Sequence, residues 1–377
     1  MTREGVASPL GAQEDGAKPR RIPALVVFPF YPDNDWQEIV YADLRRDGVD
    51  ITVLESIRVE PWMRDILHDG GSLILHLNWT TPISQTSADV VASMTEVLRV
   101  LDELTQFRRL GGRILWTVHN VLPHELKYLS SELVLCQGLA NLADTIMIMN
   151  PDTPQLVSDW YTLPPAKTTQ IDHPSYVGRF PNTVSAAEAR HAHGLSSDDV
   201  VLLFVGSIRP YKGLEDLIPA FEKAHAKDNR LKLLVAGPLG PGYSGEQIDE
   251  LFAPRAGLTA EIGYINADRM QYWCNAADVM VLPYRESLNI SVVSLAASFG
   301  LPVLIRRAPS SEYLHAQDWV SYMDSNQLET DLLATGLRFH GNSAARHASQ
   351  VAAHETSPVR VAGEFASIVR RLASLRQ

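Results

Sequence analysis

The segment LLFVGSIRPYKGLEDLIPAF, residues 202–221, decides how the rest of the chain is interpreted. Its first residues form a continuous apolar run, which is typical of a buried strand in a parallel sheet. Gly206 ends this strand, a short loop with Arg209 and Lys212 follows, and Gly213 opens an amphipathic helix. A strand, a glycine turn and a helix N-terminus together favour an anionic ligand. A plain turn with two solvated basic side chains explains the same spacing, so both interpretations stay open.

Short apolar runs alternate with helical stretches along the whole chain. Helices are predicted at 35–46 and 88–110, and strands at 24–30, 51–54, 73–77, 114–118, 145–149, 167–171, 200–205, 231–236, 261–265, 279–282 and 302–305. Strands that alternate with helices are typical of parallel α/β sheets. The pattern pauses at 174–197, where Pro, Gly and a Ser-Ser-Asp-Asp run predict an irregular linker between two domains.

The length of 377 residues also suggests two domains, because a domain usually takes roughly 100–200 residues. We expect a disordered leader at 1–21, an N-terminal Rossmann-like domain at 22–180 and a C-terminal Rossmann-like domain at 181–358. The last stretch, 359–377, places Val361, Phe365, Ile368 and Leu372 on one helical face. This pattern favours a packed terminal helix over a helix that lies on a membrane surface.

Composition excludes several classes of protein. The formal net charge of -11 argues against a nucleic-acid binder, which would need a basic face. Cys136 and Cys274 form no CxxC pair, so neither a zinc ribbon nor a disulfide framework is expected. No stretch reaches the roughly 18 apolar residues of a membrane span. A cytoplasmic protein is expected, and peripheral contact with the inner face of the membrane stays compatible with the sequence.

A second informative stretch is ADVMVLPYRESLNISVVSLAASFGLPVL, residues 277–304. Asn289 or Ser291 suits the N-cap of its helix, and Gly300 suits the helix end. Glu286 follows the carboxyl end of the preceding strand, where open α/β sheets bind ligands. It could therefore accept hydrogen bonds from sugar hydroxyls, although a surface glutamate in a loop fits the pattern equally well.

Taken together, the two segments resemble the donor-site motifs of GT-B glycosyltransferases, especially the retaining family 4, also called group 1. The resemblance spans Leu202–Leu304 and is weaker over the N-terminal half. It implies two Rossmann-like domains that face each other across a cleft, with the terminal helix packed back on the first domain. It also implies a nucleoside-diphosphate sugar as co-substrate, no cofactor and no metal. The acceptor would be a glycan or lipid-linked intermediate of surface polysaccharide biosynthesis.

The resemblance assigns roles to individual positions of this sequence. Lys212 would bind the donor pyrophosphate, and Glu286, the first glutamate of the family pair, would contact the donor sugar. The loop after Glu286 would bring backbone N–H groups to phosphate and sugar, and two residues after an earlier strand would meet the nucleotide base. These further positions are Ser287, Leu288, Asn289 and Ile290 for the loop, and Gly263 and Tyr264 for the base.

Two positions depart from the family pattern. Ser207 stands where a basic residue normally follows the glycine of the first motif, and Arg209 lies two positions further on. Ser294 replaces the second glutamate of the pair, which usually contacts the nucleotide ribose. The identity of the nucleotide and the retaining outcome are therefore left open.

In the N-terminal half, residues 116–125 read WTVHNVLPHE. His119 and Asn120 end a predicted strand, and His119 resembles the family histidine that faces the donor sugar. A structural histidine is the alternative. His124 and Glu125 lack the second histidine of a zinc protease motif, so no metal site is assigned to them.

An acceptor groove is expected beside the first and third predicted strands. Asp33 and Asn34 follow the first strand and could line it, although a turn and a helix cap explain them equally well. Trp79 could stack on a sugar ring, whereas a buried or rim tryptophan is the commoner outcome. Asn120 is the fourth residue that is expected to contact the acceptor.

One glycine pattern points to a different ligand. Gly240, Gly242 and Gly245 match G-x-G-x-x-G, but the first glycine comes late after its strand, and Glu261 is expected to begin the next strand rather than end it. NAD binding is therefore rejected. Two rival functions remain: a nucleotide-sugar 2-epimerase of the same fold, and a non-catalytic nucleotide-sugar-binding subunit, which the serine at 294 motivates.

Overall fold

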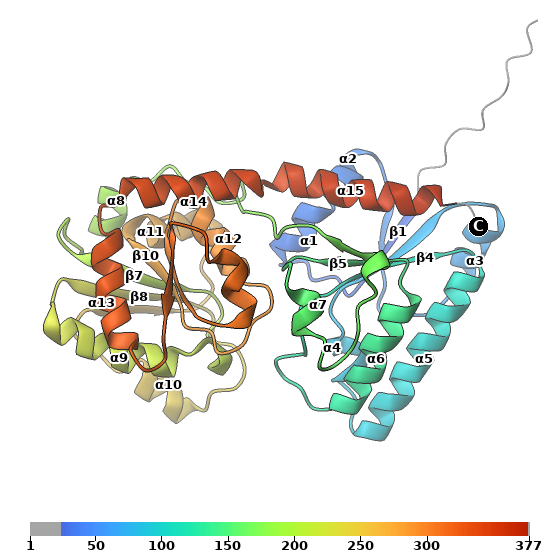
Figure 1. The fold of residues 1–377 in the computed structure, drawn as a ribbon, viewed down its shortest axis with the longest axis horizontal. Coiled ribbons are helices and arrows are strands. Elements are labelled where there is room, and N and C mark those ends of the chain that lie inside the picture. The colour runs from blue at the N-terminus through green and yellow to red at the C-terminus, as the bar shows by residue number, and fades with distance from the viewer. Residues whose placement is uncertain (1–23, 376–377) are drawn as a thin grey trace, which may run out of the picture.

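A computed structural model of the protein describes residues 24–375, which form two α/β domains that lie side by side (Figure 1). The predicted leader at 1–21 lies outside the described residues. Each domain is built around a 6-stranded sheet, and the strands that pair within these sheets are parallel. The predicted class of two parallel α/β domains is therefore correct.

The N-terminal sheet has the strand order β2-β1-β3-β4-β5-β6. Its strands are β1 (Ala24–Phe28), β2 (Ile51–Val53), β3 (Leu73–Leu77), β4 (Arg113–Thr117), β5 (Thr145–Ile148) and β6 (Thr168–Gln170). Each lies within or one residue beside a predicted strand, because the continuous apolar runs of the sequence are the parts of the chain that the sheet buries.

Helices cover both faces of the N-terminal sheet. They are α1 (Asp35–Val40), α2 (Ala42–Arg46), α3 (Pro61–His68), α4 (Thr81–Ser84), α5 (Val90–Arg109), α6 (Leu129–Leu142) and α7 (Thr153–Leu156), with a 3-10 turn η1 (Pro165–Lys167). The single helix predicted at 35–46 is wrong, because a turn at Tyr41 divides it. That residue is fully buried, and its hydroxyl bonds to His76 of β3 at 2.8 Å.

The C-terminal sheet has the strand order β12-β11-β10-β7-β8-β9. Its strands are β7 (Val200–Val205), β8 (Leu231–Gly237), β9 (Leu258–Ile262), β10 (Val279–Leu282), β11 (Val303–Arg306) and β12 (Val320–Met323). The strand predicted at 261–265 is shifted, because β9 begins at Leu258, which pairs with Leu233 of β8. Glu261 consequently lies near the end of its strand rather than at the start.

The helices of the C-terminal domain begin earlier in the chain than its first strand. They are α8 (Ala186–Ala192), η2 (Pro210–Lys212), α9 (Leu214–Lys227), α10 (Gly245–Leu251), α11 (Ala267–Ala276), α12 (Ser291–Ser298), η3 (Pro309–Leu314), α13 (Leu328–Phe339), α14 (Ser343–Glu355) and α15 (Pro358–Ser374). The irregular linker predicted at 174–197 is therefore wrong over α8. Ser185 and Glu188 form a capping box there, and Ala189 enters the core of this domain.

The last helix returns to the first domain (Figure 1). It follows α14 of the C-terminal domain and packs against α1 and α2, with its apolar side chains buried in the N-terminal core. Phe365 lies 5.5 Å from the ring of Tyr41 and 5.0 Å from that of His76, measured between centroids. Its apolar face is thus covered by the N-terminal domain and is not available to a membrane surface.

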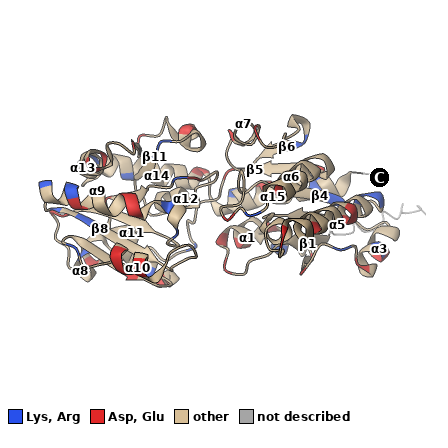
Figure 2. Cartoon of the chain, turned by 90° about the horizontal axis from the view of Figure 1, so that it is seen from below, with Lys and Arg blue, Asp and Glu red and all other residues tan. Residues whose placement is uncertain are grey.

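Positions occupied by Lys or Arg and by Asp or Glu are scattered along the ribbons of both domains (Figure 2). Within residues 24–375, no helix is long and apolar enough to cross a membrane.

Candidate active site

The carboxyl ends of the two sheets meet through the loop that follows Glu286. Asn289 donates from Nδ2 to the backbone oxygens of Val118, at 3.3 Å, and His119, at 2.8 Å. The side chain of Leu288 packs into the core of the N-terminal domain. The proposed sugar and phosphate loop therefore also holds the two domains together.

A second asparagine reaches across in the opposite direction. Asn150 follows β5 and donates from Nδ2 to the backbone oxygens of Leu288, at 3.1 Å, and Ser310, at 2.8 Å. The predicted N-cap of α12 is wrong, since the cap position is Ile290 and makes no side-chain bond. The side chain of Asn289 instead donates to the backbone oxygens of Val118 and His119.

A glycine shapes the turn that carries Lys212. Gly213 has φ 73° in the left-handed region, and a Cβ atom there would lie 2.4 Å from the backbone oxygen of Pro283. Only glycine fits both the dihedral angle and the close approach. The turn thereby packs against the loop after β10 and places the Lys212 ammonium 5.2 Å from the centroid of the Tyr284 ring.

The Lys212 ammonium is buried without a counter-charge. Only 7% of the residue is exposed, and within the described part of the chain no hydrogen bond or ion pair reaches its Nζ atom. Burial, and secondarily the nearby charge of Arg209, lowers the pKa of Lys212 to about 8. A desolvated cation of this kind is stabilised when an anion binds beside it.

Arg209 faces the N-terminal domain. Its guanidinium pairs with the Glu125 carboxylate at 3.1 Å, and the ring of the neighbouring Tyr211 stacks on His124 with centroids 4.1 Å apart. The basic loop therefore contacts the loop after β4 across the domain boundary. For Arg209 to serve a diphosphate, it would have to exchange Glu125 for the ligand.

The glycine pattern at 240–245 packs along the basic loop. Gly240 donates its N–H to the backbone oxygen of Ile208 at 2.9 Å, and a Cβ atom at Gly240 would lie 2.9 Å from Oγ of Ser207. Glu261 near the end of β9 is already paired with Arg269 at 2.5 Å. These glycines allow two loops to approach closely, and the place of Glu261 predicted from the sequence is wrong. The rejection of NAD stays a prediction.

Three predicted donor positions lie apart from the residues that join the domains. Gly263 follows β9 and donates its N–H to the backbone oxygen of Gly237 at 3.0 Å, and Tyr264 beside it is 75% exposed. Ser294 is partly buried in α12, where its backbone oxygen accepts a bond from Ser298 at 2.6 Å. Their roles toward a nucleotide stay predictions.

A hydrogen-bond network fixes the imidazole of His119. Its Nε2 lies 3.2 Å from Oδ1 of Asn78, whose Nδ2 lies 3.4 Å from the backbone oxygen of Pro29. A carbonyl can only accept, so the Asn78 amide must direct its oxygen toward His119. It follows that His119 donates from Nε2 and keeps Nδ1 as an acceptor. Burial lowers the pKa of His119 well below its usual value, which keeps the ring neutral.

The same network continues into the sheet. Asn78 lies 3.3 Å from the hydroxyl of Tyr41, which bonds to His76, and Nε2 of His76 lies 2.8 Å from Oγ1 of Thr117. Burial lowers the pKa of His76 to about 3. His76 was not among the predicted site residues, although a histidine within the apolar run LILHL was the available signal.

Trp79 supports His119. The two rings stack with centroids 4.0 Å apart and planes 17° apart, and the ring of Tyr31 lies 5.2 Å from Trp79. One face of the Trp79 ring, which was predicted to stack on a sugar, is therefore covered by the ring of His119. Asn34 caps α1 by accepting from the backbone of Gln37, whereas Asp33 is exposed.

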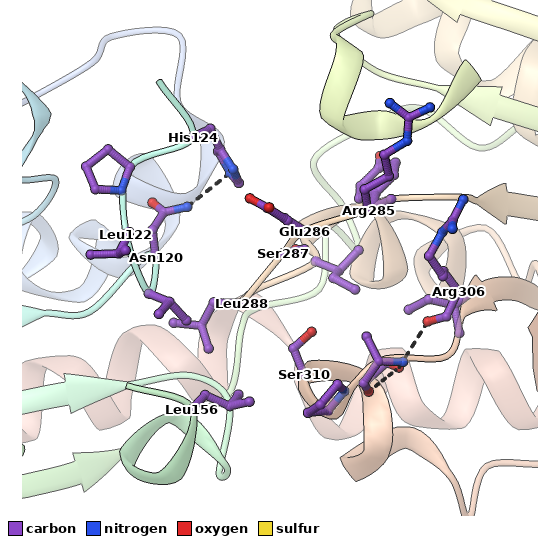
Figure 3. A pocket seen from close by; sticks show the side chains of 18 of the residues that line it. Asn120, Leu122, His124, Leu156, Arg285, Glu286, Ser287, Leu288, Arg306 and Ser310 are labelled. Carbon is purple, nitrogen blue, oxygen red and sulfur yellow. Dashed lines mark hydrogen bonds between the residues drawn. The ribbon is translucent and has the colours of Figure 1, made fainter. Parts of the chain in front are cut away.

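A cavity of about 550 Å³ lies between the domains (Figure 3). The carboxylate of Glu286 points toward His124 on its upper side, and Asn120 donates to Nε2 of His124 at 3.1 Å. Of the predicted site residues, the lining contains Asn120, Glu286, Ser287, Leu288 and Ile290. The other predicted site residues lie outside the lining: Lys212, Arg209, Ser207, His119, Gly263, Tyr264, Asn289, Ser294, Trp79, Asp33 and Asn34.

Within the described residues, no group of three or more His, Cys, Asp or Glu side chains is arranged to hold a metal ion. The expectation of a metal-free reaction stays a prediction.

Two solved structures share this architecture over nearly the whole chain. Anabaena HepE in complex with UDP and glucose has a TM-score of 0.67 at 12% identity, with 93% of this chain and 100% of that chain covered. Sucrose-phosphate synthase from Thermosynechococcus elongatus has a TM-score of 0.66 at 17% identity, with 93% and 99% covered. With the two facing parallel sheets, these likenesses define the fold as GT-B, which confirms the predicted architecture.

Part of the C-terminal domain is similar in sequence to a known family. Residues 199–334 match the sequence model of the family described as "Glycosyl transferases group 1". This match covers the part of the chain that carries the two C-terminal motifs, and it confirms the resemblance that these motifs carry.

Two named relatives match over part of their length. D-inositol 3-phosphate glycosyltransferase of Streptomyces avermitilis is 29% identical over 197 residues, which are 47% of this chain and 42% of that protein. GDP-mannose:glycolipid 4-beta-D-mannosyltransferase of Xanthomonas campestris pv. campestris is 26% identical over 239 residues, or 63% and 62%. The chain therefore spans less than two thirds of the length of these relatives.

Proposed function

We propose that the protein is a glycosyltransferase that moves a sugar from a nucleoside-diphosphate sugar to a hydroxyl acceptor. The observation that carries this proposal is the buried Lys212 ammonium, which has no counter-charge and lies on the turn between β7 and α9. A diphosphate would supply the missing negative charge. Cleavage of the sugar–phosphate bond adds charge to that diphosphate, and a preorganised cation stabilises the added charge.

The neutral ring of His119 suits the sugar side of the same reaction. As the bond to the leaving group breaks, a glycosyl centre gains oxocarbenium character. An imidazolium beside it would oppose that positive charge, whereas a neutral ring does not. Nδ1 of His119 would accept a bond from a sugar hydroxyl, and the exposed Glu286 carboxylate would accept others.

The similar proteins support the choice of substrates without fixing it. HepE was solved with UDP and glucose, and the names of the two relatives specify an inositol phosphate and a glycolipid. For this protein we propose a glycan or lipid-linked acceptor of surface polysaccharide biosynthesis, handled in the cytoplasm at the inner face of the membrane and without a metal ion.

A thermal-shift screen tests the donor. Ligands that bind only the folded state raise its stability by mass action. UDP, GDP or their sugars should raise the midpoint of unfolding more than NAD or ATP does, and Lys212→Ala should abolish the difference. Lys223→Ala, which removes an exposed lysine of α9, is the matched control and should respond as the wild type does. A larger shift with NAD than with any diphosphate sugar would refute the proposal.

The two rival functions give different products. A 2-epimerase would convert the donor to its epimer without an acceptor, and a non-catalytic subunit would bind the donor without turnover. Product analysis of a donor-only reaction and of a reaction with an acceptor panel separates them from transfer.

A further inference from the structure

The cavity between the domains is lined by Glu286 and by part of the proposed sugar and phosphate loop, but not by the basic loop that carries Lys212. Glu286 and Ser287 line it, whereas Lys212 and Arg209 do not. Because Glu286 lines the cavity, a molecule in it would lie beside the proposed sugar site. At about 550 Å³, the cavity falls within the size range of small-molecule sites.

The charges of the lining argue against a second diphosphate in this cavity. Arg285 and Arg306 both contribute to the wall, but each is already paired with Asp216, at 3.1 and 3.0 Å. Arg285 also lies 3.6 Å from Glu215, so the carboxylates of Asp216 and Glu215 together compensate the two guanidinium charges. This arrangement contrasts with the uncompensated ammonium of Lys212.

The rest of the lining is mainly apolar and comes from both domains. The N-terminal domain contributes the loop after β4 and the segment around α7, and the C-terminal domain contributes the loops after β10 and β11 (Figure 3). Trp160 and Leu126 on its rim are 42% and 37% exposed, so large apolar side chains face solvent there. The apolar members are Val121, Leu122, Pro123, Leu126, Leu156, Trp160, Leu288, Ile290, Ile305, Ala308 and Pro309.

We propose that this cavity binds the apolar group of the acceptor, such as an alkyl or prenyl chain, while the acceptor hydroxyl faces the sugar at the Glu286 end. This inference rests on the proposed function and adds to it the place and chemistry of acceptor recognition. Of the four residues predicted to contact the acceptor, Asn120 lines the cavity, whereas Asp33, Asn34 and Trp79 do not.

Binding of n-alkyl β-glucosides from methyl to octyl tests the inference without requiring turnover. Calorimetry would be run on the full chain with saturating UDP, below the micelle concentration of each glucoside. Affinity should rise roughly three- to fourfold for each methylene group that becomes buried. Trp160→Ala should remove at least tenfold of the octyl affinity and leave the weak methyl affinity unchanged.

A second variant tests the same cavity in case Trp160→Ala does not fold. Ala308→Trp fills the cavity from the C-terminal side and should abolish the dependence on chain length while UDP still binds. Leu98→Ala, which removes an exposed apolar side chain of α5 outside the lining, is the control and should bind every glucoside as the wild type does.

The outcomes separate the two proposals. Affinity that does not depend on chain length, or the same dependence in Ala308→Trp as in the wild type, would overturn the cavity assignment although UDP binds. A wild-type chain that binds neither UDP nor GDP would instead overturn the proposed function.

Discussion

At the scale of single residues, the proposed chemistry depends on one buried cation, the ammonium of Lys212. The motif placed Lys212 on a turn between a strand and a helix, and the structure adds that its ammonium is buried over Tyr284 without a carboxylate. Arg209 was expected beside it, but its partner Glu125 is distant in sequence and could not be inferred. Side-chain partners from another domain leave no local pattern in a sequence.

Replacing Lys212 by alanine should lower the rate of transfer by ~10²–10³, or about 2.7–4 kcal/mol, by analogy with the loss of one preorganised donor. Lys212→Arg should restore only part of the rate, because a planar guanidinium does not replace a compact ammonium. Single-turnover transfer with saturating donor measures this. A folded Lys212→Ala protein within about threefold of the wild-type rate would contradict the assignment, since that difference is under 1 kcal/mol.

The pKa of Lys212 predicts how UDP affinity depends on pH. The ammonium is present below pH 8 and is lost as the pH rises through about 8, so UDP should bind more weakly above that value. In Lys212→Met this dependence should disappear, and the free energy of unfolding at pH 7 should increase, because an unpaired buried charge has been removed. Calorimetric titrations between pH 6.5 and pH 9.5 and urea denaturation check both effects. An unchanged UDP affinity across this range would exclude a role for the ammonium.

Asn78→Asp should charge the ring of His119. A carboxylate at this position would favour the imidazolium and raise the pKa of His119, which burial now holds well below its usual value. The protonated form exists below the raised pKa, so transfer should fall at low pH and recover as the pH rises. Nitrogen-15 spectra of the imidazole provide a reading independent of activity. They should show a proton on Nε2 alone in the wild type, and a proton on Nδ1 there would contradict the assignment.

At the scale of elements, the strong apolar runs were predictable and the weak ones were not. The strands β1, β3, β7 and β10 are buried throughout or nearly so, and the sequence located each of them to within two residues. By contrast, β9 is an edge strand with partly exposed residues, so its apolar pattern is faint and its start was misplaced. The helix α8 was missed because its buried face is small and the segment around it is rich in turn-forming residues.

The turn between η2 and α9 depends on Gly213, and this can be measured. Gly213→Ala would place a Cβ atom 2.4 Å from the Pro283 oxygen at φ 73°, whereas Gly48 has φ 74° with nothing within 4 Å of the added atom. Gly48→Ala should therefore report only the cost of the dihedral angle. Gly213→Ala should cost a further 1–3 kcal/mol or so from overpacking. Urea denaturation of the two variants gives the difference, and equal destabilisation would show that the loop adjusts freely.

At the scale of the whole molecule, the site exists only because two domains meet. The cavity is built from loops after β4, β10 and β11, and Asn150 and Asn289 bind across the boundary. The sequence predicted site residues in both domains. The periodicity and spacing within one domain do not, however, indicate how the other domain is oriented. The cavity itself was therefore not predictable, although five predicted site residues line it.

The ion pair between Arg209 and Glu125 links the basic loop of the C-terminal domain to the N-terminal domain, and it could compete with a bound diphosphate. If a donor diphosphate takes Arg209 from Glu125, the bound state loses this pair, and Glu125→Gln should tighten UDP binding. Both side chains are partly exposed, at 35% and 58%, so such a pair contributes about 0.2–1 kcal/mol. The expected gain is therefore about fivefold at most, and it should shrink at high salt, where exposed charges are screened.

Calorimetry of UDP binding at low and high salt measures this gain. Arg209→Ala should weaken binding, and the double variant should bind like Arg209→Ala, because Glu125 would act only through Arg209. Glu38→Gln, which breaks the exposed pair with Arg45 on α1 and α2, is the matched control and should leave UDP affinity unchanged. Weaker binding in Glu125→Gln would mean that the ion pair persists in the complex. The contact would then hold the domains closed around the donor rather than compete with it.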